Sequence, residues 1–307
     1  MAEQVTPYFN AMKLGAHRDL CGELLKAVRA EGLRMGFYYS LLEWHNELYQ
    51  TEVDRFVAEM NLPQMKELVN RYQPDILWPD GEWYYPWQTY RGPEFLAWLY
   101  NESPVKDSIV VNDRWGKGMR GKCGDHYTSE YENGWGADHP WEECRGIGRS
   151  FGYNRMERAR HYRTPTELVE LLASLCSRGG NLLLNIGPDG TGQIPVVMEE
   201  RLLAIGKWLE VNGEAIYGTQ AWKNGPKTMA ADRVYYTAKG DAVYAIVFGP
   251  VGKVRVKGAG RVRDVSLLGA SRKLEWKQQG EDVEVTMPAF LLGDAPCEHA
   301  LTLKLVK

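Results

Sequence analysis

Two apolar runs of this chain end in charged side chains, and a tryptophan stands beside each end. Ile76-Leu77-Trp78 runs into Asp80, and Ile109-Val110-Val111 runs into Asn112-Asp113-Arg114-Trp115. Short apolar runs between turn residues are typical of buried strands. Barrel enzymes keep their catalytic groups at the carboxyl ends of parallel strands. A lone Asp80 would be more simply explained as a cap on the next turn, but two consecutive strand ends of this kind lead us to interpret them as part of an active-site rim.

A pair of carboxyl groups on such a rim would suit glycoside hydrolysis. A retaining glycosidase uses one carboxylate as nucleophile and a second group, about 5–5.5 Å away, as acid/base. Asp80 is the candidate nucleophile, because the end of a strand is rigid. The second group is expected on the aromatic-rich stretch from Trp115 to Trp141, which we interpret as a loop. Glu130 is the first candidate and Glu142 the second, and a solvated surface charge is the alternative explanation for either.

Three further side chains are candidates for substrate contact. Tyr38 and Trp78, on predicted strands, could pack against a sugar ring or belong to the core. Arg114 could clamp substrate hydroxyls or form a structural ion pair. The composition favours carbohydrate, since 11 Trp and 17 Tyr outnumber 7 Phe and aromatics with a polar edge suit surfaces that are both apolar and hydrogen-bonding.

Charge and hydropathy exclude several classes of partner. The net charge is −3, and no block of basic residues is present, which argues against a nucleic-acid or anionic-membrane partner. No apolar run reaches the roughly 18 residues of a membrane span. The first residues show neither the charged nor the apolar region of a signal peptide. The sequence therefore does not indicate export, and the protein as expressed is expected in the cytoplasm.

No cofactor or metal ion is predicted. The five cysteines are scattered without a Cys-x-x-Cys pair, and the six histidines show no paired spacing, so neither a disulfide framework nor a metal site is indicated. The glycine-rich stretch 187–192 lacks the spacing of a dinucleotide fingerprint and the lysine of a P-loop.

Alternating helices and strands must position these residues. Helical spacing is predicted over 18–30, 63–72, 93–101, 165–179 and 195–211, and strands over 35–40, 76–80, 109–114 and 181–187, with 150–154 as an optional fifth. Near-continuous apolar strands between helices indicate a parallel α/β sheet. A closed barrel needs eight strands, so the sheet is either open or an incomplete (β/α)8-type barrel.

The sequence changes character after Trp222. A hairpin is predicted over 234–247, and short β runs follow at 253–257, 262–268, 273–277, 282–287 and 300–306. This spacing is typical of a small antiparallel β-sandwich. We therefore predict two domains, a partial (β/α) barrel over 1–218 and a β-sandwich over 222–307.

The motifs resemble those of the glycoside hydrolase family 29 α-L-fucosidases. The matching segments are 17–24, 39–44, 78–83, 103–107, 111–116, 141–142, 179–188 and 212–217. The resemblance covers nearly the whole chain and is most specific before residue 218. It implies a retaining hydrolase of terminal α-L-fucosides.

The resemblance also implies residue roles. Asp80 matches the nucleophile, and Tyr38, Trp78 and Arg114 match positions that line the fucose pocket. The acid/base position varies between members of the family; Glu130 is favoured and Glu142 is the alternative. Two other functions stay open, namely a non-catalytic fucose- or carbohydrate-binding remnant of the family and a glycosidase of other specificity.

One departure from the family affects assembly. Its members carry a longer N-terminal part with the first barrel strands, for which this sequence shows no equivalent residues. An uncovered parallel edge favours association. We therefore expect a homo-oligomer in which another copy covers the open barrel edge. The fucosyl linkage and the aglycone are not readable from the sequence.

Overall fold

The computed structural model describes residues 9–132, 134–135, 138–225, 230–250, 252–291 and 293–307. The chain divides into two compact units, Met1–Thr128 and Ser129–Lys307. The boundary expected between residues 218 and 222 stays a prediction. No helix in the described ranges is long and apolar enough to cross a membrane.

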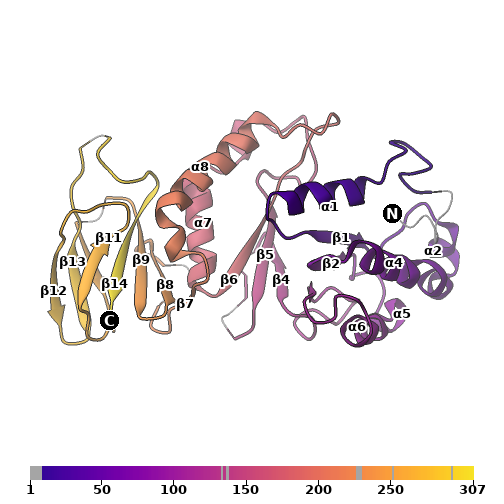
Figure 1. The fold of residues 1–307 in the computed structure, drawn as a ribbon, viewed down its shortest axis with the longest axis horizontal. Helices are drawn as coiled ribbons and strands as arrows, with labels where there is room; N and C mark the ends of the chain where they lie inside the picture. The colour runs from indigo at the N-terminus through magenta and orange to yellow at the C-terminus, as the bar shows by residue number, and fades with distance from the viewer. Residues whose placement is uncertain (1–8, 133, 136–137, 226–229, 251, 292) are drawn as a thin grey trace. The chain divides into compact units, whose positions relative to one another are not determined.

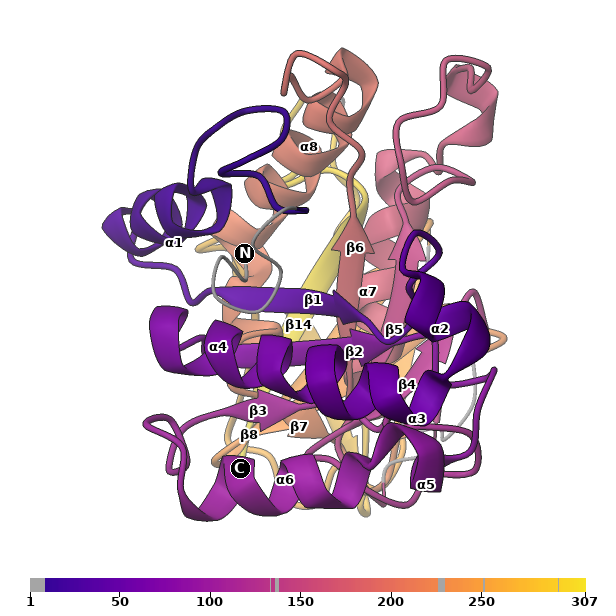
Figure 2. The ribbon, with the colours of Figure 1, turned by 90° about the vertical axis from the view of Figure 1, so that its right-hand side faces the viewer.

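The first unit contains a three-stranded parallel sheet of order β1-β2-β3. Its strands are β1 (Gly36–Ser40), β2 (Ile76–Asp80) and β3 (Val110–Val111). Its helices are α1 (Leu20–Ala30), α2 (Glu47–Thr51), α3 (Val53–Phe56), the π-helical turn Val57–Asn61, α4 (Leu62–Tyr72), α5 (Trp87–Tyr90) and α6 (Gly92–Asn101). Helices α4 and α6 lie over one face of the sheet (Figure 2).

Side chains alternate between the two faces of this sheet, so that one face forms the hydrophobic core and the other carries the candidate site residues. Phe37, Tyr39 and Leu77 are buried in the hydrophobic core. The intervening residues point to the other face because side chains alternate along a strand. On that face the register pairs Tyr38 with Trp78, and Ser40 with Asp80.

A second sheet, of order β4-β5-β6, is made of β4 (Tyr127–Glu130), β5 (Trp141–Gly146) and β6 (Gly180–Asn185), and it belongs to the second unit from Ser129 on. Strands β5 and β6 are parallel. The connection between them includes α7 (Pro165–Ser177). The Thr164 side chain caps α7 and Glu167 reaches back to it, which forms a capping box at the start of the helix.

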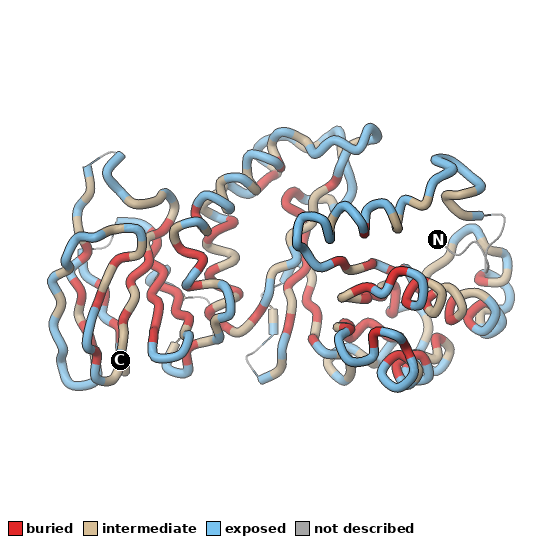
Figure 3. Tube along the Cα trace, in the orientation of Figure 1, coloured by how far each residue is buried: buried red, intermediate tan, exposed pale blue. Residues whose placement is uncertain are grey.

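The rest of this unit contains two antiparallel sheets of order β11-β14-β9-β8-β7 and β10-β13-β12. The strands are β7 (Gln220–Ala221), β8 (Val234–Lys239), β9 (Ala242–Phe248), β10 (Lys253–Val256), β11 (Asp264–Leu267), β12 (Glu275–Gln279), β13 (Asp282–Thr286) and β14 (Ala300–Val306). Valines of β9, β10 and β13 share one core. On its other face β9 packs with α7 and α8 (Val196–Asn212), so β9 is buried throughout (Figures 1 and 3).

Three details of the sequence prediction are wrong. Residues 115–141 are not all loop, because β4 and the first residue of β5 lie there, and residues 150–154 form no strand. The third strand ends at Val111 and leaves Asp113 and Arg114 in the following turn. Strands β4 and β5 were missed because their sequences are polar: Glu143 is fully buried, pairs with Arg145 and accepts a hydrogen bond from Ser129.

Candidate active site

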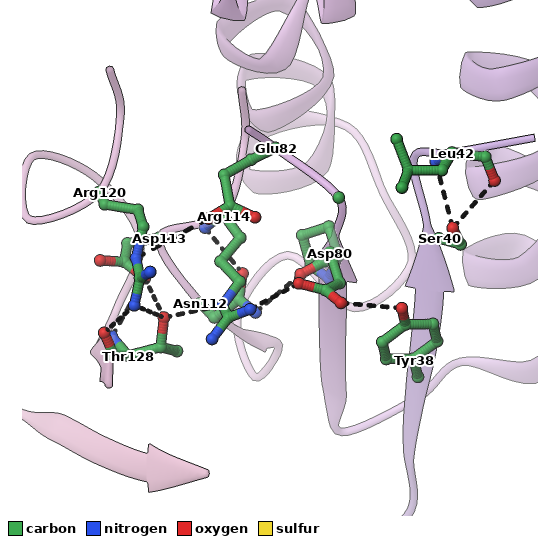
Figure 4. A network of polar contacts seen from close by, with 12 residues as sticks. Tyr38, Ser40, Leu42, Asp80, Glu82, Asn112, Asp113, Arg114, Arg120 and Thr128 are labelled. Atoms are coloured by element: carbon green, nitrogen blue, oxygen red, sulfur yellow. Dashed lines mark hydrogen bonds and ion pairs between the residues drawn. The ribbon is translucent and has the colours of Figure 1, made fainter. Parts of the chain in front are cut away.

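Asp80 is the last residue of β2, and both of its carboxylate oxygens have partners. Nη1 of Arg114 donates to Oδ1 at 2.6 Å, and the Tyr38 hydroxyl donates to Oδ2 at 2.9 Å (Figure 4). Gly81 follows with φ +94°, and a Cβ there would lie 2.6 Å from Cγ of Leu42. The chain therefore turns away sharply after the carboxylate and leaves it at the end of the strand.

Arg114 is 1% exposed and is held on several sides. Its Nε donates to Oγ1 of Thr128 at 3.0 Å, and that hydroxyl donates to Asp113 Oδ1 at 2.8 Å. The guanidinium lies 4.6 Å from the centre of the Trp78 ring. A buried arginine fixed in this way can present one nitrogen to Asp80 in a constant direction.

Tyr38 joins the site from β1. Its ring stacks on Trp78 with the centroids 5.9 Å apart. Although the residue is 59% exposed, its hydroxyl end is partly desolvated, and this together with the negative charge of Asp80 raises the pKa of Tyr38. The hydroxyl therefore stays protonated and serves as a hydrogen-bond donor at physiological pH.

Glu82 belongs to the same network, and sequence reasoning did not select it. It is 4% exposed, and its Oε1 lies 3.8 Å from Nε of Arg120. Arg120 in turn donates to the Thr128 carbonyl at 2.5 Å. Burial raises the pKa of Glu82, and the charge of Arg114 partly opposes this. The signal in the sequence was its position only two residues after Asp80, just beyond the turn at Gly81.

The structure brings together Asp80, Tyr38, Trp78 and Arg114 in the first unit. Glu130 and Glu142 belong to the second unit. Both are half-buried, and each lies on a strand rather than on the predicted loop. Glu130 is the last residue of β4, and Glu142 is the second residue of β5.

The site offers an oriented carboxylate with aromatic surfaces beside it. Among the residues that the structure describes, no group of three or more His, Cys, Asp or Glu side chains is arranged to hold a metal ion. A carboxylate held by an arginine and a tyrosine can attack an electrophilic carbon or accept hydrogen bonds from a polar ligand. The exposed ring of Tyr38 adds a flat surface on which such a ligand can pack, whereas Trp78 is 8% exposed and supports Tyr38 and Arg114.

Comparisons with known proteins cover both parts of the chain. A family model described as alpha-L-fucosidase matches residues 2–214, and one described as alpha-L-fucosidase C-terminal domain matches residues 227–306. The tissue alpha-L-fucosidase of Rattus norvegicus is 42% identical over 97% of this chain and 68% of its own length. The alpha-L-fucosidase of Branchiostoma floridae is 40% identical over 97% of this chain and 69% of its own.

Solved structures agree with these matches. The Thermotoga maritima alpha-fucosidase, in complex with a mechanism-based inhibitor, is 34% identical with a TM-score of 0.77, and the match covers 98% of this chain and 71% of that one. Alpha-L-fucosidase isoenzyme 1 from Paenibacillus thiaminolyticus gives a TM-score of 0.83 at 25% identity, over 99% and 78% of the two chains. The predicted fold class, an incomplete (β/α)8-type barrel followed by a small antiparallel β-sandwich, is confirmed.

Proposed function

We propose that this chain, which belongs to the α-L-fucosidase family and is a glycoside hydrolase, releases terminal α-L-fucose from fucosylated glycans or glycosides with retention of configuration. The observation that carries the proposal is Asp80, whose two oxygens are held by Arg114 and Tyr38 at the carboxyl end of β2. A nucleophile must be ionised and correctly oriented before it reacts. These two contacts orient the carboxylate, and the guanidinium places a positive charge beside it.

In the proposed mechanism, Asp80 attacks the anomeric carbon of fucose while a carboxylic acid protonates the leaving oxygen. Water, activated by the same residue acting as base, then hydrolyses the glycosyl-enzyme. Tyr38, stacked on the buried Trp78, provides aromatic surface for the sugar ring, and Arg114 neutralises the carboxylate that forms again when the intermediate breaks down.

Glu130 is our candidate for the acid/base, with Glu142 as the alternative. The position of each on its strand supports this order. The hydroxyl of Tyr131, the residue after Glu130, accepts a hydrogen bond from the Gly146 N–H at the carboxyl end of β5, at 2.9 Å. Glu142 lies instead near the amino end of β5. Catalytic groups of barrels gather at the carboxyl ends of the strands.

Hydrolysis of 4-nitrophenyl α-L-fucoside by the parent chain and by Asp80→Ala tests the proposal. We expect the variant to lose roughly 10³-fold or more of kcat, the usual scale for removing a nucleophile. Proton NMR of the first-formed sugar should show the α-anomer. No release of nitrophenol by a well-folded parent would contradict the proposal and favour the alternative of a non-catalytic fucose-binding protein.

We also propose that the protein forms homo-oligomers. In the part of the chain that the structure describes, β1 pairs only with β2, and β6 pairs only with β5. Leu183 of β6 is 38% exposed, although strands of parallel sheets are normally buried on both faces. A second copy that covers these edges would remove apolar surface and unpaired strand groups from water.

A further inference from the structure

A pocket of about 370 Å³ in the second unit has a cationic lining. It is formed by Tyr131, Arg145, Gly146, Gly148, Arg149, His161 and Arg163. Its volume falls in the range of about 300–1,000 Å³ that is usual for ligand pockets. None of these seven described residues is acidic, so the pocket is suited to an anion.

The pocket lies where substrates approach a barrel sheet. Its residues belong mainly to the stretch 147–164, which follows the carboxyl end of β5 and leads to α7. One hydrogen bond holds this stretch against the end of β6: Asn185 Nδ2 donates to the Phe151 carbonyl at 2.5 Å. The chain also passes so close to Gly187 that an added Cβ there would lie 2.6 Å from the Tyr153 nitrogen. The pocket is therefore part of the strand-end rim that carries substrate contacts in barrel enzymes.

Two further positive charges in the lining are exposed to solvent. Arg145 is buried and paired with Glu143. Neither Arg149 nor Arg163 forms a side-chain hydrogen bond or ion pair among the described residues, although the charge of Arg163 acts on Glu167 and the backbone N–H of Arg149 donates to Glu157. Gathering like charges in one concavity is unfavourable without a counter-ion, and guanidinium groups match the geometry of oxyanions.

His161 adds a neutral donor to these charges. Its Nδ1 accepts the N–H of Arg158 at 3.1 Å. In the neutral ring the proton is therefore on Nε2, and that nitrogen can donate to a ligand.

Aromatic rings beside the pocket indicate a sugar rather than a free ion. Tyr131, Phe151 and Tyr153 are all exposed, and the rings of Tyr131 and Phe151 lie 5.3 Å apart. Tyr131 has φ +52°, a left-handed conformation that is uncommon for a residue other than glycine and concentrates at functional sites. Flat apolar faces next to guanidinium groups fit a saccharide that carries a negative group.

We propose that this pocket binds a sulfate ester or carboxylate on the saccharide from which fucose is released, so that anionic fucosides are the preferred substrate class. The inference rests on the proposed function at one point, the role of Glu130. If Glu130 protonates the leaving oxygen, the leaving saccharide lies against it, and the next residue, Tyr131, lines the pocket.

Isothermal titration calorimetry tests the pocket independently of turnover. The Asp80→Asn variant, which leaves the pocket residues unchanged, would be titrated with fucosyl-α-1,3-N-acetylglucosamine, with its 6-sulfate and with fucosyl-α-1,3-glucuronic acid. We expect at least one anionic disaccharide to bind roughly tenfold more tightly than the neutral one, the usual scale for charge-assisted hydrogen bonds. If the 6-sulfate binds more tightly than the glucuronic acid disaccharide, the anion is a sulfate ester; if the order is reversed, it is a carboxylate.

Two double variants distinguish binding in the pocket from a general attraction between the anionic ligand and the positive charges of this stretch. Adding Arg149→Met and Arg163→Met should remove the preference. Adding Arg155→Met and Arg160→Met instead removes the same amount of charge from the same stretch. The preference for the anionic disaccharide should remain, because these exposed arginines do not line the pocket. Equal affinity for all three disaccharides, or equal loss in both pairs, would overturn the inference. Hydrolysis of 4-nitrophenyl α-L-fucoside by the parent reports separately on the proposed function.

Discussion

Arg114 connects most contacts of the candidate site, because it touches Asp80, Thr128 and the Trp78 ring while being almost fully buried. Lysine keeps the charge but is a single point donor on a flexible stem, so it cannot make these contacts together. We expect Arg114→Lys to lower kcat/KM for 4-nitrophenyl α-L-fucoside by roughly 100-fold or more. Arg91→Lys, which changes a half-buried arginine paired with Glu94, is the control and should leave kcat/KM unchanged.

Glu82 gives a prediction about the pH dependence of stability. Burial raises its pKa above the ordinary 4.5, so the folded state binds this proton more tightly than the unfolded state. The stability linked to protonated Glu82 is therefore fully present below its ordinary pKa and is lost as the pH rises through the raised value. Glutamine resembles the protonated form at every pH.

We therefore expect the melting temperature of Glu82→Gln, relative to that of the parent, to increase between about pH 4 and pH 7. Differential scanning calorimetry across this range measures the difference. The exposed Glu94→Gln is the control. A difference that stays constant or decreases with pH would show that Glu82 is not stabilised in its protonated form.

At the scale of the elements, apolar runs made most of the fold predictable. The predicted helix over 18–30 and the predicted strand ending at Asp80 correspond to α1 and β2, because their buried sides are apolar at regular spacing. Strands β4 and β5 could not be found in this way, since their buried positions include Ser129, Glu143 and Arg145. Such residues satisfy one another only after the strands meet, and a single sequence window does not contain that information.

The buried pair of Glu143 and Arg145 should consequently be sensitive to the loss of one partner. Glu143→Ala would leave Arg145 buried without its carboxylate, which costs about 3–5 kcal/mol. Urea unfolding followed by circular dichroism measures the free energy. The double variant Glu143→Met, Arg145→Met is expected to recover much of the loss, and a single variant as stable as the parent would contradict the prediction.

The start of α7 allows a second test at this scale. The Thr164 hydroxyl accepts the N–H of Glu167 at 3.3 Å and donates to its carboxylate at 2.8 Å. Thr164→Ala should lower the free energy of unfolding by about 1 kcal/mol. Thr164→Ser keeps the hydroxyl and should cost little, whereas equal losses in the two variants would point to the methyl group instead of the cap.

At the scale of the whole molecule, the chain spans about two thirds of the length of the curated relatives it matches, 68% for the Rattus norvegicus enzyme. The motifs around Asp80 and Arg114 were sufficient to predict the family. They could not predict whether the sheet edges at β1 and β6 are covered, because the pattern of a strand's own residues does not identify its neighbour. Assembly therefore has to be measured.

We expect light scattering and analytical ultracentrifugation to give a mass that is a multiple of the chain's 34.9 kDa. Leu183→Lys should lower that mass, because a charge on the exposed edge strand β6 opposes pairing with a second copy. Val196→Lys is the matched control, since Val196 is an apolar residue that is 79% exposed at the start of α8, away from any strand. A monodisperse species of 34.9 kDa at every concentration would contradict association. An equal effect of the two variants would mean that the β6 edge is not the contact.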